Sequence, residues 1–203
     1  AAADMAGAVA AAEEICARDP NNTFLPQQFT NPANPQIHRE TTALEILSAC
    51  RGELDVFVAG VGSGGTITGV GQVLKRHLSR VHIVAVEPAL SPILGGGVSA
   101  NHGIQGIGAG FVPSVLDREC IDEVVAISDQ QAFELTRRLA SEEGLLLGPS
   151  SGANVAAALA VAERLGPNLR LVTLLCDTGF RYFSVDGLIA KPVKSLGYNG
   201  SVT

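Results

Sequence analysis

Short apolar runs alternate with segments of helical periodicity along most of the chain. Runs rich in aliphatic and β-branched residues predict six strands, at 23–29, 54–60, 81–88, 122–128, 144–148 and 169–176. Apolar positions spaced three and four residues apart predict five helices, at 1–15, 36–50, 66–79, 129–143 and 150–166. Alternation of this kind predicts an α/β fold with a mainly parallel, twisted sheet and helices on both faces.

Local signals mark the ends of several predicted elements. Ser128 or Asp129 is placed to cap the helix that follows, and Gly166 ends the last predicted helix. The glycine-rich stretch 95–110 has no period and is long for a plain connector, so it predicts a working loop. Ligands of parallel sheets gather at the carboxyl ends of the strands. The glycine loops at 60–65 and 148–152 both follow predicted strands, and we therefore expect both at that edge.

Composition and charge narrow the classes of partner. The 203 residues are 46% hydrophobic and 17% charged, which predicts a folded chain with a substantial core. The net charge of −6 and the lack of a Lys/Arg cluster argue against nucleic acid as a partner. No apolar run reaches the ~18 residues that span a bilayer, and the acidic first fifteen residues do not resemble a signal peptide. The four cysteines lack CxxC spacing and predict buried thiols in a reducing, cytoplasmic compartment.

The sequence GVGSGGTITG at 60–69 has the composition of a phosphate-binding loop. Gly60, Gly62 and Gly65 satisfy G-x-G-x-x-G between a strand and a helix, and Glu87 ends the next predicted strand, where a ribose-binding acid is expected. An NAD-dependent dehydrogenase is therefore one interpretation.

A second interpretation of the same loop is a site for one phosphate group. The hydroxyls of Ser63 and Thr66, the loop amides and a helix N-terminus can all converge on a single dianion. No lysine follows the loop, which excludes a Walker-type nucleotide site.

The sequence GPSSG at 148–152 also has two interpretations. It satisfies the G-x-S-x-G pattern of a hydrolase nucleophile, but the last histidine is His102, upstream of Ser150, so the usual triad order cannot be completed. Alternatively, Ser150 at a helix start can hydrogen-bond a pyridine nitrogen while the 62–66 loop takes a phosphate. Pyridoxal phosphate has both groups at opposite ends of a small plate. A neutral hydroxyl partner does not enforce a protonated ring, which favours elimination and replacement over transamination.

Longer blocks of sequence carry a family resemblance over residues 5–184. FLPQQFTNPANPQIHRETTALEI, AGVGSGGTITGV, GIQGIGAGFVP, EEGLLLGPSSGANVAAAL and LLCDTGFRYFS follow one another in order. Together they resemble the cysteine synthases (O-acetylserine sulfhydrylases), β-family pyridoxal-phosphate enzymes of fold type II. Cystathionine β-synthases share several of the blocks. The LCDTG version of the late strand is similar to one subset of the family and would place Cys176 and Asp177 close to the ring end of the cofactor.

The resemblance implies a cofactor and a set of contact residues. The cofactor is pyridoxal 5'-phosphate, its phosphate cup falls on Gly62, Ser63, Gly64, Gly65 and Thr66, and its ring-nitrogen serine falls on Ser150, with Ser151 as a helix cap. Gln28 falls on the residue that holds the carboxylate side of the substrate, and Gly106 and Ala109 fall on the active-site wall. The alternatives are a loop-fixing amide at Gln28, backbone packing at Gly106 and Ala109, and a plain helix cap at Ser63 and Thr66.

The implied activity is β-replacement, which forms L-cysteine from O-acetylserine and sulfide, with no metal. The family's Schiff-base lysine matches none of Lys75, Lys191 and Lys194, so it is expected upstream of Ala1 and no catalytic residue is assigned here. The implied domains are the end of a small N-terminal domain with a crossover at 1–30, a cofactor-binding domain at 31–185 and a tail at 186–203. The implied partners are a second copy in a homodimer and the C-terminal peptide of serine acetyltransferase. A cystathionine β-synthase-like or O-phosphoserine-using relative, or a non-catalytic half without the lysine, stays open.

Overall fold

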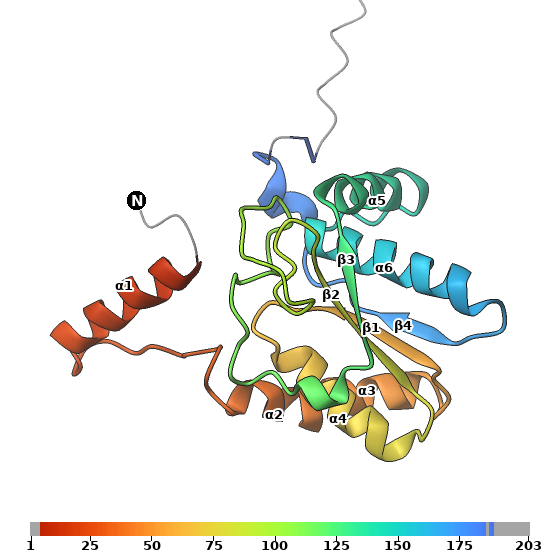
Figure 1. The fold of residues 1–203 in the computed structure, drawn as a ribbon, viewed down its shortest axis with the longest axis horizontal. Helices are drawn as coiled ribbons and strands as arrows, with labels where there is room; N and C mark the ends of the chain where they lie inside the picture. The colour runs from red at the N-terminus through yellow and green to blue at the C-terminus, as the bar shows by residue number, and fades with distance from the viewer. Residues whose placement is uncertain (1–4, 186, 189–203) are drawn as a thin grey trace, which may run out of the picture.

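The computed structural model describes residues 5–185 and 187–188, so nearly all of the predicted tail at 186–203 lies outside the described residues. Figure 1 shows the elements in chain order. The elements are α1 (Met5–Arg18), α2 (Ala33–Glu40), α3 (Thr42–Ala49), β1 (Val56–Gly60), α4 (Gly65–His77), β2 (His82–Pro88), the 3-10 helix η1 (Arg118–Cys120), β3 (Glu123–Ile127), α5 (Asp129–Glu142), α6 (Pro149–Leu165), β4 (Leu171–Thr173) and the 3-10 helix η2 (Gly179–Tyr182).

The four strands form one parallel sheet in the order β3-β2-β1-β4. In the register of the two central strands Val58 lies opposite Val84, and on the other side of β1 it lies opposite Thr173 of β4. The chain passes from β1 to β2 and β3 in one direction, and then returns to place β4 on the far side of β1. The strand order therefore reverses between β1 and β4, where α/β sheets open a crevice for ligands.

Side chains of the central strands alternate between two cores. Phe57 and Ile83 point to the face that α3 and α4 cover, whereas Val58 and Val84 point to the face that α5 and α6 cover. Figure 1 shows α2, α3 and α4 below the sheet, and α5 and α6 above it. The apolar runs at 54–60 and 81–88 are continuous because both faces of the strands are buried. The predicted α/β class with helices on both faces is confirmed.

The structure corrects two predicted elements near the N-terminus. The helix predicted at 36–50 is two helices, because Thr41 leaves helical geometry (φ −125°, ψ −77°) between α2 and α3. The run at 23–29 is no strand: Pro26 lacks a backbone donor, and Phe24 is 86% exposed instead of packing on a sheet.

Further differences lie around the last two helices. The run at 144–148 makes only one antiparallel bridge, from Leu147 to Thr178, and the strand predicted at 169–176 is restricted to β4. Ser128 caps α5 with a capping box, as one of the two predicted alternatives. Ser151 is not the cap of α6, since that position belongs to Gly148.

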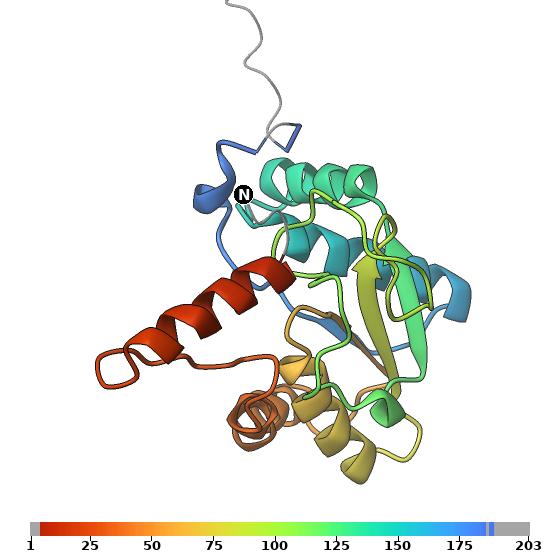
Figure 2. The same cartoon turned by 60° about the vertical axis from the view of Figure 1, so that its left-hand side comes forward.

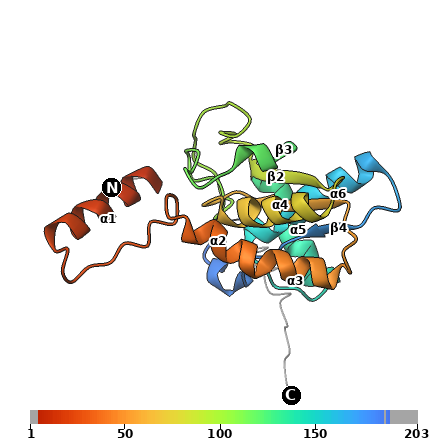
Figure 3. The ribbon, with the colours of Figure 1, turned by 90° about the horizontal axis from the view of Figure 1, so that it is seen from below.

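Helix α1 differs from the other helices in its surroundings. None of its residues is buried, and Figure 2 and Figure 3 show it standing apart from the sheet and its covering helices. No helix in the described part of the chain combines the length and apolar character that a membrane crossing requires.

Candidate functional site

The loop after β1 and the first turn of α4 together contain the five residues of the predicted phosphate cup. Gly64 is the N-cap of α4 with a left-handed backbone (φ +84°), and Gly65 and Thr66 form the first turn of the helix. The first amides of a helix have no partner within the helix, so the N-terminus of α4 offers donors and a positive dipole end to an anion. Ser63 and Thr66 add a hydroxyl on each side of that turn.

Helix α2 supports both hydroxyls of the cup. Asn34 donates from Nδ2 to Ser63 Oγ at 2.9 Å, and His38 Nε2 lies 3.1 Å from Thr66 Oγ1. The other ring nitrogen of His38 lies 2.9 Å from Thr42 Oγ1. Burial lowers the pKa of His38, so at neutral pH the uncharged ring donates at one nitrogen and accepts at the other. The sequence pattern did not identify Asn34 and His38 as residues that support the cup.

Ser150 lies in the first turn of α6 and is 3% exposed. Burial of the sulfur raises the pKa of Cys176, and the Ser150 hydroxyl opposes that rise. The residue as a whole is exposed, so the prediction of a buried thiol is wrong for Cys176. The next hydroxyl, Ser151 Oγ, accepts from the backbone N–H of Cys176 at 2.9 Å. The segment after β4 therefore holds the turn that presents Ser150.

Gly106 lies between the cup and Ser150. A Cβ built on Gly62 would lie 2.5 Å from the carbonyl oxygen of Gly106, and a Cβ built on Gly106 would lie 3.4 Å from Ser150 Oγ. Gly106 has a left-handed backbone (φ +98°). The neighbouring Gly108 N–H donates to Val61 O at 2.9 Å, which fixes this loop to the cup loop. The two glycine turns and the predicted wall residue Gly106 thus meet at one rim of the sheet.

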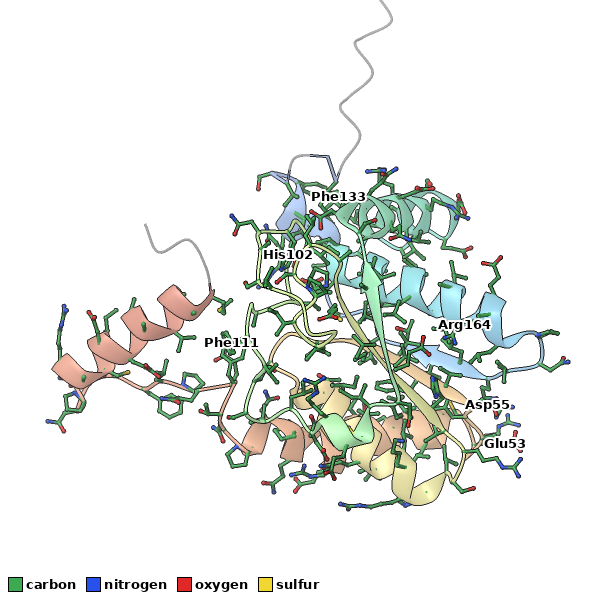
Figure 4. All side chains as sticks on the ribbon, in the orientation of Figure 1. Glu53, Asp55, His102, Phe111, Phe133 and Arg164 are labelled. Atoms are coloured by element: carbon green, nitrogen blue, oxygen red, sulfur yellow. The ribbon has the colours of Figure 1, made fainter. Side chains whose placement is uncertain are left out.

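The long glycine-rich loop also lines a hollow. A cavity of about 520 Å³ lies between α1 and residues 99–110, and both Gly106 and Ala109 border it. His102 pins this loop, because its Nε2 lies 3.0 Å from the carbonyl oxygen of Gly108. Figure 4 shows His102 in the upper part of this loop and Phe111 on the side of α1. The predicted working loop is therefore at the same rim as the cup.

Gln28 lies between α1 and α2 and is exposed. It borders a smaller hollow of about 200 Å³, together with residues of α1. Its backbone carbonyl accepts from Asn34 Nδ2 at 2.8 Å, so the same carboxamide contacts the Gln28 segment and Ser63. A different hollow, of about 670 Å³, lies at the amino ends of the strands around 52–55, 78–81 and 168–170, and none of the predicted site residues borders it.

The structure gives Glu87 a role that does not suit a dehydrogenase. Glu87 is 3% exposed, and its two carboxylate oxygens accept from the backbone N–H groups of Leu94 (2.7 Å) and Gly95 (2.9 Å). Because the carboxylate holds the start of the glycine-rich loop, its oxygens are occupied and not open to a ribose. Glu87 therefore does not support the dinucleotide interpretation, which then rests on the G-x-G-x-x-G pattern alone.

A second hydrogen-bonded group lies behind Ser150. Tyr182 donates its hydroxyl to Asp177 Oδ2 at 2.5 Å, and the Gly148 N–H donates to the carbonyl oxygen of Asp177 at 3.2 Å. Burial and the Asp177 carboxylate raise the pKa of Tyr182 to about 12. A side chain on Gly148 would collide with Asp177 and Tyr182, so the turn before Ser150 packs directly against this pair.

The residues present fit a phosphate group with an attached ring. The first amides of α4 have no partner within the helix and can bind a dianion, whereas the glycines of the cup allow Gly106, Leu116 and Asn34 to approach closely. Within residues 5–185 and 187–188, no group of three or more His, Cys, Asp or Glu side chains is placed to hold a metal ion.

Comparison with known proteins identifies a family and several relatives of this chain. The model of the family described as "Pyridoxal-phosphate dependent enzyme" matches residues 1–177. Cysteine synthase B of Campylobacter jejuni is 50% identical over 182 residues, covering 90% of this chain and 60% of that protein. A cysteine synthase of Staphylococcus aureus is 46% identical over 181 residues, covering 89% of this chain and 58% of that protein. The chain thus spans about 60% of the length of these relatives.

Solved structures with a similar fold include O-acetyl serine sulfhydrylase isoform 3 from Entamoeba histolytica, with a TM-score of 0.82 and 42% identity. That match covers 89% of this chain and 54% of the other. O-ureido-L-serine synthase has a TM-score of 0.81 and 46% identity, and the match covers 85% of this chain and 54% of the other.

Proposed function

The chain belongs to the family of pyridoxal-phosphate dependent enzymes, and from that premise we propose that it is the cofactor-binding part of an enzyme that makes L-cysteine from O-acetylserine and sulfide. The observation that supports this most is the close approach of Gly106 to both Gly62 and Ser150. It brings a phosphate-sized cup and a buried hydroxyl to one rim of the sheet. The names of the relatives, cysteine synthase and O-acetyl serine sulfhydrylase, point to the same reaction.

The residues of the rim have separate proposed tasks. The amides and hydroxyls of Gly62–Thr66 bind the phosphate of pyridoxal phosphate, and Ser150 hydrogen-bonds the pyridine nitrogen. Gln28 holds the carboxylate side of the amino-acid substrate, and Gly106 and Ala109 leave room for it at the wall. When bound, pyridoxal phosphate supplies the electron sink on which β-elimination and replacement depend. The lysine of this chemistry is expected outside residues 1–203.

The wider organisation is proposed on the same basis. Residues 1–30 are the end of a small N-terminal domain and its crossover, 31–185 are the cofactor-binding domain, and 186–203 are a tail. The separation of α1 from the body supports the first boundary. We also propose a cytoplasmic homodimer that binds the C-terminal peptide of serine acetyltransferase. These proposals rest on the resemblance to cysteine synthases.

Ligand binding tests the proposal for the 203-residue chain. Pyridoxal phosphate is expected to raise the melting temperature, by an amount that grows with the logarithm of its concentration above the dissociation constant. Pyridoxal without phosphate and NAD are expected to leave the melting temperature unchanged. A rise in melting temperature with NAD and none with pyridoxal phosphate would favour the dehydrogenase interpretation. For the protein that includes the lysine, L-cysteine formation is measured with O-acetylserine and sulfide.

One alternative concerns the second substrate. The structural neighbour named O-ureido-L-serine synthase shows that 46% identity extends to a protein with another product name. Assays with homocysteine or hydroxyurea in place of sulfide, and with O-phosphoserine in place of O-acetylserine, decide between these reactions. Products only with homocysteine would indicate a cystathionine β-synthase-like enzyme. A protein that binds the cofactor but has no lysine after a strand upstream of Ala1 would indicate a non-catalytic half.

A further inference from the structure

Asn34 has a position that the proposed function does not yet explain. Its side-chain nitrogen lies 2.9 Å from Ser63 Oγ in the cup and 2.8 Å from the carbonyl oxygen of Gln28. Ser63 follows Asn34 by 29 residues in the chain, and Gln28 precedes it by 6. One carboxamide therefore bridges the proposed cofactor side and the proposed substrate side of the rim.

The chemistry of the two partners fixes the orientation of the Asn34 amide. A backbone carbonyl can only accept a hydrogen bond, so the NH₂ group must face Gln28, and its second hydrogen is then directed to Ser63. The rest of the carboxamide packs on Gly65, where a side chain would collide with it. Glycine at position 65 thus makes room for Asn34 as well as for the turn itself.

These contacts decide what the Ser63 hydroxyl can do. Its oxygen accepts from Asn34 Nδ2 and, at 3.5 Å, from the Gly65 N–H. In the described part of the chain no acceptor lies in reach of the hydroxyl hydrogen itself. A serine whose lone pairs are occupied offers its proton to the next acceptor, and an anion in the cup is such an acceptor.

We propose that Asn34 is a positioning residue that turns the Ser63 hydroxyl into a donor for the cofactor phosphate and ties the Gln28 segment to the occupied cup. The inference rests on the proposed function and deepens it, because it names a residue that connects cofactor binding to the substrate-binding segment. Filling the cup then holds Ser63, Asn34 and the Gln28 carbonyl in one chain of hydrogen bonds.

Two variants of Asn34 and one matched control test the inference. Asn34→Ala removes the donor, and Asn34→Asp keeps the size but puts a carboxylate where Ser63 would donate to it, next to the phosphate. Asn31→Ala is the control, since Asn31 lies just before α2 and its side chain bonds Pro26 O and the Ala33 N–H, without a contact to the cup. The measurement is the dissociation constant of pyridoxal phosphate by calorimetry, with inorganic phosphate as a second probe.

The expected result is a graded loss. Asn34→Ala weakens pyridoxal phosphate binding about 10-fold, Asn34→Asp about 100-fold, and Asn31→Ala less than about 2-fold, following the strength of hydrogen bonds to charged groups. In a Ser63→Ala background, Asn34→Ala causes no further loss, because its effect passes through that hydroxyl. Inorganic phosphate shows the same order.

Hydrogen exchange tests the connection to Gln28. In the wild-type chain, pyridoxal phosphate is expected to slow amide exchange in segment 27–31, and Asn34→Ala abolishes that response while Asn31→Ala keeps it. Wild-type affinity in Asn34→Ala, or an equal loss with and without Ser63, would overturn the inference while leaving the proposed function intact. A wild-type chain that binds neither pyridoxal phosphate nor phosphate would instead overturn the proposed function, and the inference with it.

Discussion

Gly62 faces the backbone of Gly106 so closely that a Cβ on Gly62 would lie 2.5 Å from the Gly106 carbonyl oxygen. The two residues are 44 positions apart and belong to the loops after β1 and β2. Their contact depends on the absence of a side chain, since a backbone oxygen cannot turn aside as a flexible side chain can. The distance between the cup and Ser150 is thus set by two glycines.

Gly62→Ala is expected to separate the two loops. We expect a loss of about 1–3 kcal/mol of unfolding free energy, as for other overpacked sites, together with loss of the melting-temperature shift by pyridoxal phosphate. Gly52→Ala is the control: no atom lies within 4 Å of its Cβ, but its φ of +73° makes the substitution strained. It should cost about 1–2 kcal/mol and keep the shift. Equal shifts in both variants would contradict the prediction.

Ser150→Ala is expected to weaken only the binding of the ligand's ring. We predict about 10-fold weaker binding of pyridoxal phosphate and unchanged binding of inorganic phosphate, both measured by calorimetry. Ser141→Ala serves as control, because Ser141 is an exposed hydroxyl on α5 that bonds its own helix. Equal weakening of both ligands would show that Ser150 supports the fold rather than the ring.

Tyr182→Phe tests the group behind Ser150. The pKa of Tyr182 is raised from 10.0 to about 12 by burial and by the Asp177 carboxylate. A raised pKa means that the neutral phenol stabilises the fold below pH 10 and that this stability is lost as pH rises towards 12. Tyr182→Phe should lower the unfolding free energy at pH 8 by about 2 kcal/mol, because Asp177 loses a buried donor.

Denaturant unfolding between pH 8 and 12 measures this effect. The difference between wild type and Tyr182→Phe should shrink as pH rises above 10. Phe183→Leu, on the exposed neighbour, should show no such change. A difference that stays constant up to pH 12 would contradict the assigned hydrogen bond.

Glu123 is expected to govern part of the acid stability. Burial raises its pKa, but hydrogen bonds from Arg164 and His82 outweigh that effect and lower it below 4.5. Arg164 lies 2.6 Å from the Glu123 carboxylate and connects α6 to β3, and Figure 4 shows it on the helix beside the sheet. A lowered carboxylate pKa stabilises the fold above pH 4.5, and that stability is lost as pH falls through the folded-state value.

Glu123→Gln should therefore cost about 1 kcal/mol at pH 7 and progressively less below pH 4.5. Unfolding by urea at pH 7, 4.5 and 3 measures the change. Glu163→Gln is the control, because Glu163 is next to Arg164 on α6 and makes no ion pair within the described residues. The ion pair would be irrelevant to stability if both variants behaved alike at every pH.

The central sheet could be predicted from the sequence because its strands are buried on both faces. The runs around Phe57 and Ile83 are apolar without alternation, and they become β1 and β2. The cup loop was predictable as well, since its position between a strand and a helix follows from local pattern. The short apolar run at 144–148 gave a wrong strand prediction. Leu145 and Leu146 are 41% and 38% exposed, and their segment makes a single bridge instead of a strand.

The contacts that join distant segments could not be predicted. Asn34 meets Ser63 across 29 residues, and Tyr182 meets the turn before Ser150 across more than 30. Such pairs depend on how α2 packs on α4 and on where the chain after β4 returns, and neither follows from periodicity. A polar residue in a Pro-rich loop looks like a turn former until its partner is known.

A structure of the chain with bound pyridoxal phosphate tests the two-turn grip most directly. The account predicts the phosphorus atom above the amides of residues 63–66, with the Ser63 hydroxyl in hydrogen-bond distance, and the pyridine nitrogen about 3 Å from Ser150 Oγ. A cofactor whose phosphate lies elsewhere, or whose ring nitrogen points away from Ser150 while the phosphate occupies the cup, would contradict it.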